Sequence, residues 1–166
     1  MAIELIILDV DGTLTDGKIL YGAETELKAF DVKDGLAIAS WIRLGRQAAI
    51  VTGRSSAIVE RRAKELGIVH CYQGVRHKGA RVEQLLKTLG LEPSQAAAMG
   101  DDLNDWSMLE MVGRSYAPAD AVERIRRRVD RVVEAPGGSG AVRAMIEELI
   151  EREGLTREFL ELWSVG

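Results

Sequence analysis

The sequence predicts a three-layer α/β/α sandwich in which a parallel sheet is covered by helices on both faces. Short apolar runs alternate along the chain with amphipathic segments of helical period, an alternation that is typical of parallel sheets with crossover helices. The first run, residues 3–8, is almost continuously aliphatic, as expected for a strand that is buried on both sides. Together these observations predict a Rossmann-like sheet.

The remaining elements follow the same rhythm. Weaker apolar runs predict strands at residues 48–51, 69–72, 96–99, 116–117 and 132–133. Amphipathic periodicity predicts helices at residues 35–44, 55–66, 78–89, 106–112, 121–128 and 142–152. Helix ends are expected at Gly67, Gly90 and Gly113.

Two segments interrupt this rhythm. Residues 17–33 lack a helical period, and strand-like runs at 18–21 and 26–32 flank a turn, which predicts a projecting β-hairpin. A projecting hairpin exposes an unpaired edge that often pairs with another copy, so we expect an oligomer. The tail, residues 154–166, ends in large apolar side chains, and we expect it to dock on this chain or on a neighbour.

Length and composition exclude several classes of protein. A chain of 166 residues, 46% hydrophobic and 29% charged, with a mean hydropathy of -0.04, is expected to form one domain, residues 1–166, without a membrane span. The net charge of -4 and pI near 5.3 argue against nucleic-acid binding, which needs a broad cationic surface. The single cysteine, Cys71, fits a reducing compartment, and we expect the cytoplasm.

An acidic motif, Asp9-Val10-Asp11-Gly12-Thr13, follows the first predicted strand. Side chains two residues apart on a strand project to the same side, and open α/β sheets bind ligands at the carboxyl edge. Two carboxylates held this close need a cation or a shared proton. The motif therefore indicates a divalent-metal site or an acid/base dyad, unless it is an ordinary turn rich in Asp and Gly.

A second acidic group, Asp101, Asp102 and Asp105, follows the predicted strand at residues 96–99. Because parallel strands end at the same edge of a sheet, we expect the two acidic loops to meet around one hard cation with oxygen ligands. Asp102 or Asn104 could instead cap the next helix. Capping alone does not account for three carboxylates.

Hydroxyl and cationic groups complete the candidate site. Thr52, Gly53 and Arg54 end the next strand and offer a hydroxyl, a backbone N–H and a guanidinium that can bind phosphate. Lys78 begins a predicted helix and could contact an anion above the carboxylates. Taken singly, a Thr-Gly-Arg turn is ordinary and a lysine is usually a solvated surface charge, so the argument depends on the combination.

Motif spacing excludes several competing sites. An EF-hand starting at Asp9 would need Gly and Glu where Leu14 and Leu20 stand. A Walker loop over residues 12–18 would need Ser or Thr where Ile19 stands. The sequence also contains no G-x-S-x-G serine elbow and no cysteine-phosphatase motif. Among phosphatase nucleophiles, an aspartate therefore remains the candidate.

The chain resembles the haloacid dehalogenase-like phosphatase superfamily in the order and spacing of its motifs. These motifs are Asp9-x-Asp11-Gly-Thr, Thr52-Gly-Arg54, Lys78 and Gly100-Asp101-Asp102-x-x-Asp105. Longer stretches resemble one subfamily, the 3-deoxy-D-manno-octulosonate 8-phosphate phosphatases of lipopolysaccharide biosynthesis, at residues 8–17, 26–35, 50–54, 72–74, 100–106 and 137–143. The resemblance covers nearly the whole chain.

The resemblance implies a mechanism and a set of site residues. Asp9 would attack phosphorus, and Asp11 would protonate the leaving sugar oxygen and then activate water. Thr52 and Lys78 would hold the phosphoryl group. Mg²⁺ would be bound by Asp9, the Asp11 carbonyl and Asp101, while Asp102 and Asp105 would position water and Lys78. The sugar acid would contact Asp31, Val32, Lys33, Asp34, Gly35, Gly53, Arg54 and Arg62.

The resemblance also implies an assembly and leaves the substrate partly open. About 36 residues separate Asp16 from Thr52, too few for a cap domain. The subfamily is typically tetrameric through its hairpins, with a neighbour's tail near the site, which implies a homotetramer. Ala39 and Ser139 depart from the subfamily pattern, which has a basic residue and an arginine there. These departures leave the sugar open, and a nine-carbon sialic-acid-like 9-phosphate is the alternative substrate. Promiscuous phosphatase activity and a non-catalytic oligomerisation module are separate alternatives.

Overall fold

The first apolar run of the sequence forms the central strand β1 (Leu5–Leu8) of a six-stranded parallel sheet. The computed structural model describes residues 1–166. The other strands are β4 (Gln47–Val51), β5 (His70–Tyr72), β6 (Ala96–Met99), β7 (Arg114–Ala117) and β8 (Arg131–Val132). Their order in the sheet is β5-β4-β1-β6-β7-β8. Leu8 lies opposite Ile50 of β4 and Met99 of β6, so three neighbouring strands end at the same level.

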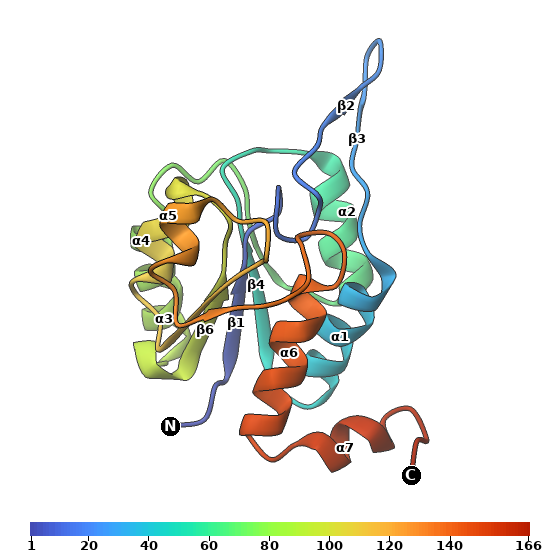
Figure 1. Cartoon of the computed structure of the whole chain (residues 1–166), viewed down its shortest axis with the longest axis vertical. Coiled ribbons are helices and arrows are strands. Elements are labelled where there is room, and N and C mark those ends of the chain that lie inside the picture. Colours follow the sequence, from blue (N-terminus) through green and yellow to red (C-terminus); the bar gives the residue numbers. More distant parts are fainter.

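Helices cover both faces of this sheet, which confirms the predicted three-layer sandwich (Figure 1). One face carries α1 (Val32–Arg43), α2 (Ala57–Leu66) and α6 (Ala141–Arg152), and the other carries α3 (Lys78–Leu89), α4 (Trp106–Leu109) and α5 (Glu123–Arg126). Short 3-10 helices span Pro93–Gln95 and Leu103–Asp105. Ile6 and Leu8 point into one core layer while Leu5 and Ile7 point into the other. None of the helices combines the length and apolar character that crossing a membrane requires.

Several predicted boundaries are wrong, for local reasons. The strand predicted at 26–32 ends at Leu27, because the Asp31 side chain accepts a hydrogen bond from the Asp34 N–H and caps α1, which begins at Val32. The fourth and fifth helices are shorter than predicted. Gly113 ends no helix, since its N–H donates to Pro93 O over 2.7 Å and turns the chain towards β7.

The predicted hairpin and tail lie at opposite ends of the molecule (Figure 1). β2 (Leu20–Tyr21) and β3 (Glu26–Leu27) form a separate antiparallel pair that projects from the carboxyl edge of the sheet, with strands shorter than predicted. The tail forms an unpredicted helix, α7 (Thr156–Glu161). Phe159 is buried, and the Trp163 indole N–H donates to Ser40 Oγ over 3.0 Å. The tail therefore docks on its own chain.

Candidate active site

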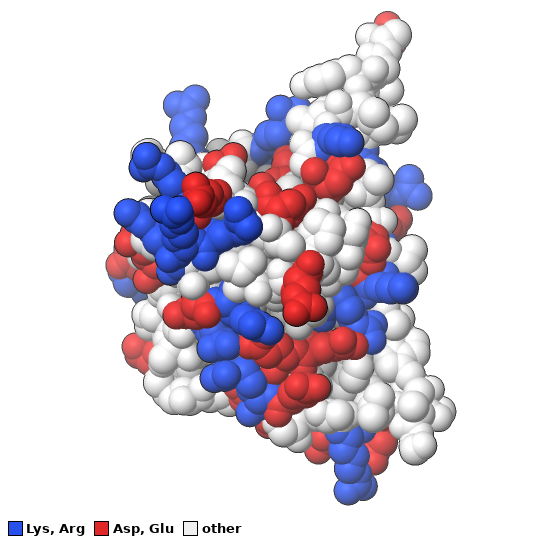
Figure 2. Space-filling model, viewed as in Figure 1, with Lys and Arg blue, Asp and Glu red and all other residues white.

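The loops that follow β1, β4 and β6 meet at the carboxyl edge of the sheet. They enclose a cavity of about 180 Å³ whose lining combines residues of three sequence motifs: Asp9, Asp11, Thr52, Gly53, Arg54, Asp101, Asp102 and Asn104. Acidic side chains gather at the base of the hairpin, with basic side chains beside them (Figure 2). A larger hollow of about 640 Å³ beside α2 and β5 contains no metal-ligating cluster. The smaller cavity is therefore the candidate active site, because it is lined by carboxylates that can ligate a metal.

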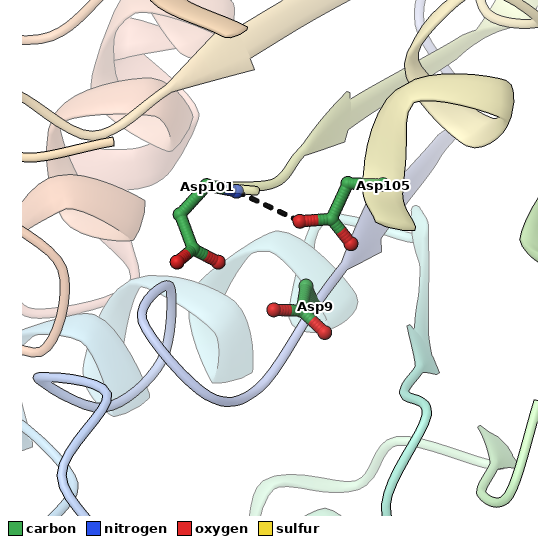
Figure 3. Close-up of side chains that lie close together, drawn as sticks. All are labelled: Asp9, Asp101 and Asp105. Carbon is green, nitrogen blue, oxygen red and sulfur yellow. Dashed lines mark hydrogen bonds between the residues drawn. The ribbon is translucent and has the colours of Figure 1, made fainter. Parts of the chain in front are cut away.

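Three carboxylates crowd together in this region. One oxygen from each of Asp9, Asp101 and Asp105 lies within 4.8 Å of the other two (Figure 3). Burial and the Asp105 carboxylate raise the pKa of Asp9 to about 6. Burial and the carboxylates of Asp9 and Asp105 raise the pKa of Asp101 to about 8. Because oxygen donors carrying excess negative charge suit a hard divalent cation, these residues fit Mg²⁺.

Lys78 is the one cation buried within this cluster. Its side chain is 1% exposed, and its Nζ donates to Asp9 Oδ1 and Asp105 Oδ1 over 2.6 Å each. Burial alone would lower the pKa of this ammonium, but the two carboxylates raise it. One ammonium does not offset three carboxylates, so the cluster still lacks positive charge.

Both carboxylate oxygens of Asp105 accept hydrogen bonds from other groups of the protein. Its Oδ2 accepts the backbone N–H groups of Asp101 over 2.8 Å and Asp102 over 3.1 Å, and its side chain is fully buried. Its other oxygen receives Lys78. Asp9 and Asp101 therefore remain as the carboxylates available to a cation, while Asp105 shapes the loop.

Gly12 allows the two acidic loops to approach one another. Its φ is +94°, and a Cβ at this position would overlap the Asp101 carboxylate. The neighbouring Thr13 hydroxyl donates to Asp101 Oδ1 over 3.3 Å. A side chain at position 12 would thus be strained in its backbone and would displace a candidate metal ligand.

The base of the hairpin contacts two of the residues that line the cavity, Asp11 and Arg54. Lys28 Nζ donates to Asp11 Oδ1, and Arg54 Nη2 donates to Glu26 Oε2 over 3.0 Å. Arg54 Nε lies 4.0 Å from Asp11 Oδ2. Sequence reasoning missed Glu26 and Lys28, although their spacing of two in a strand-like run was a signal that both could face one side. It also assigned Asn104 only to capping, whereas Asn104 lines the cavity.

Of the residues expected to contact a sugar acid, Gly53 and Arg54 line the cavity, while the others form a separate group around the start of α1. None of Asp31–Gly35 or Arg62 lines the cavity. Arg62 Nη2 donates to Asp31 O over 3.4 Å and lies over Gly35. Val32 and Lys33 are exposed. Asp34 is buried and its Oδ1 accepts the Arg143 N–H over 2.8 Å, so its carboxylate faces the interior.

Burial makes Asp34 an unusual carboxylate. Its Oδ2 is buried without a hydrogen-bond partner. Burial raises its pKa to about 6, against the lowering effect of the Arg143 N–H. This side chain joins the start of α1 to the start of α6 instead of pointing to the cavity.

Comparison with known proteins finds similarity in both sequence and structure. The model of the haloacid dehalogenase-like hydrolase family matches residues 73–145. The 3-deoxy-D-manno-octulosonate 8-phosphate phosphatases KdsC of Salmonella typhi and Escherichia coli K12 are 45% and 44% identical over 153 residues, which cover 92% of this chain and 81% of each relative.

Solved structures agree with the sequence comparison. A 3-deoxy-D-manno-octulosonate 8-phosphate phosphatase from Moraxella catarrhalis, in complex with magnesium ion, phosphate ion and KDO, matches with a TM-score of 0.94 and 41% identity, covering 98% of this chain and 94% of that one. The enzyme from Yersinia pestis matches with a TM-score of 0.92 and 41% identity, covering 93% and 84% of the two chains.

Proposed function

The chain belongs to the haloacid dehalogenase-like hydrolases and, within them, to the 3-deoxy-D-manno-octulosonate 8-phosphate phosphatase family, and we propose that it hydrolyses this sugar-acid phosphate to the free sugar acid and inorganic phosphate. The observation that carries the proposal is the convergence of Asp9 and Asp101 beside buried Lys78. A non-catalytic module would not require this costly burial of charge.

We assign the chemical steps to the two aspartates of the first motif. Asp9 attacks phosphorus as the bond to the sugar oxygen breaks, which gives an aspartyl phosphate. Asp11 gives a proton to the departing sugar oxygen and then takes one from the water that hydrolyses the acyl phosphate. Both side chains line the cavity, so they can face one phosphoryl group from the same wall.

Other residues of the cavity and the buried Lys78 and Asp105 beside it would bind the metal ion and the phosphoryl group and neutralise their charge. The carboxylates of Asp9 and Asp101 and the carbonyl of Asp11 would hold Mg²⁺, which offsets the repulsion between a carboxylate and a phosphate dianion. Thr52 and Lys78 hold phosphoryl oxygens. Asp102 and Asp105 would position water and Lys78.

The sugar acid would extend from the cavity towards the start of α1. Arg54 is the cation at the cavity mouth, with 45% of its side chain exposed. The proposed sugar-acid group is Asp31, Val32, Lys33, Asp34, Gly35, Gly53, Arg54 and Arg62. Within it, Lys33 is exposed and can contact a carboxylate, while the Asp31 side chain caps α1 and the Asp34 side chain accepts the Arg143 N–H at the start of α6.

The exposed hairpin supports an assembly of several copies. Leu20, Tyr21 and Leu27 are 60%, 77% and 59% exposed, and apolar surface of this kind is stabilised by burial against another chain. We propose a homotetramer of single-domain subunits, residues 1–166, acting in the cytoplasm.

Two departures from the family pattern support a second candidate substrate. Ala39 and Ser139 replace the basic residues expected at these positions, so fewer cations would contact the sugar. A nine-carbon sialic-acid-like 9-phosphate, or a broader set of phosphate esters, is therefore the alternative.

A phosphate-release screen tests this proposal. The purified chain with Mg²⁺ is assayed on eight- and nine-carbon ulosonate phosphates and on common sugar phosphates, and we expect the highest kcat/KM on the eight-carbon ester. Asp9→Asn should abolish release with an unchanged circular dichroism spectrum, and EDTA should silence the wild type. Asp16→Asn, at an exposed position of the same loop, is the matched control. A flat substrate profile would favour broad activity, and an active Asp9→Asn variant would refute the nucleophile.

A further inference from the structure

Lys28, outside the sequence motifs, has a buried side chain on a partly exposed backbone. It follows β3 at the base of the hairpin, and none of its side chain is exposed. Its only ion pair is with Asp11, whose Oδ1 accepts its hydrogen bond. No other hydrogen bond reaches the Asp11 side chain. An ammonium is costly to bury without a partner, so this pairing is a built feature of the site.

The contact fixes which way the Asp11 carboxyl group faces. Lys28 engages Oδ1 from within the protein, while Asp11 lines the cavity and is 20% exposed. Oδ2 receives no hydrogen bond, since Arg54 Nε lies 4.0 Å away. A donor on Oδ1 leaves Oδ2 as the oxygen that can carry a transferable proton.

We propose that Lys28 is a positioning residue for hydrolysis, which holds Asp11 with Oδ2 directed at the oxygen of the departing alcohol. The inference rests on the proposed function, in which Asp11 is the proton donor. Glu26, two residues earlier, holds Arg54 in the same way. The hairpin base thus contributes to the geometry of the site as well as carrying the exposed tip.

The test exploits the leaving group. An alkyl sugar phosphate releases a poor leaving group that needs a proton, whereas p-nitrophenyl phosphate releases one that does not. We expect Lys28→Met to lower kcat/KM roughly 10- to 100-fold on the sugar phosphate and less than about threefold on the aryl phosphate. Asp11→Asn should show the same selectivity. Lys18→Met removes an exposed lysine of the same hairpin and should change neither value.

The outcomes separate this inference from the proposed function. Equal losses on both substrates for Lys28→Met, with a selective loss for Asp11→Asn, would overturn the role of Lys28 alone. Equal losses for Asp11→Asn would overturn the proton-donor assignment and this inference with it. If Lys28→Met does not fold, Lys28→Gln and Lys28→Arg, which both retain a hydrogen-bond donor, are compared on the same two substrates. We expect Lys28→Gln to lose more kcat/KM on the sugar phosphate than on the aryl phosphate, and to show this difference more strongly than Lys28→Arg. Equal losses of Lys28→Gln on the two substrates would again refute the role of Lys28.

Discussion

Replacing Lys78 with methionine removes the only cation that directly contacts Asp9 and Asp105. Both carboxylates lose a partner 2.6 Å away in a buried setting. Removing one member of a buried ion pair costs about 3–5 kcal/mol. For a chain of this size each kcal/mol lowers Tm by about 2–4 °C, so we expect Tm to fall by about 6–20 °C. Phosphate release should fall at least about 100-fold, because in the proposed mechanism Lys78 is also one of the cations that hold the phosphoryl group.

The loss of stability in Lys78→Met should depend on pH, because the carboxylates that lose their cationic partner can themselves take up protons. The pKa of Asp9 is about 6 even with the lysine in place, so the variant's uncompensated charge is discharged as pH falls below that value. Differential scanning fluorimetry at several pH values should show a larger Tm deficit near pH 8 than near pH 5.

An exposed lysine on the same helix provides the control. Lys87 is 73% exposed and contacts Glu83 over 2.7 Å, so Lys87→Met should change stability by less than about 1 kcal/mol. If Lys78→Met were as stable and as active as Lys87→Met, the charge-compensation argument would be refuted.

Three further predictions concern the metal, the tail and the hairpin. The pKa values of Asp9 and Asp101 are raised to about 6 and about 8. In the metal-free protein these two protonated groups therefore stabilise the folded state fully below pH 3.8, and this stabilisation is lost as pH rises through the raised values. Mg²⁺ replaces those protons, so the Tm increase on adding Mg²⁺ should grow from about pH 6 to about pH 8, with proton release seen by calorimetry in two buffers. Trp163→Phe removes the donor to Ser40 and should cost about 1 kcal/mol in chemical denaturation with unchanged kcat. Tyr21→Asp on the exposed hairpin should shift light scattering towards smaller species.

The convergence of the acidic loops could be predicted because it follows from strand order alone. An aliphatic run that ends in Asp9 and another that ends before Asp101 form parallel neighbours, β1 and β6. Their carboxyl ends then meet whatever the details of packing. The same reasoning correctly brought Thr52 and Lys78 to this edge.

Contacts that depend on how the chain folds back could not be predicted in this way. The hairpin pattern indicates two strands but not where their base rests, so the pairing of Lys28 with Asp11 has no local signal. The start of α1 was placed three residues late because the Asp31 cap competes with a strand-like run. The docking of Trp163 on Ser40 joins segments distant in sequence through one indole N–H.

The pattern of ion pairs shows where the missing positive charge belongs. Asp9 and Asp105 share Lys78, and Asp11 contacts Lys28. Asp101 has no cationic partner; the Thr13 hydroxyl is the only donor to its side chain, and burial with the neighbouring carboxylates raises its pKa to about 8. A divalent ion bound between Asp9 and Asp101 would supply charge where the protein has none. Replacing Asp101 with a neutral residue should therefore relieve the repulsion between the carboxylates in the metal-free protein and abolish the stabilisation that Mg²⁺ provides. The same charge that destabilises this cluster is thus what binds the metal ion.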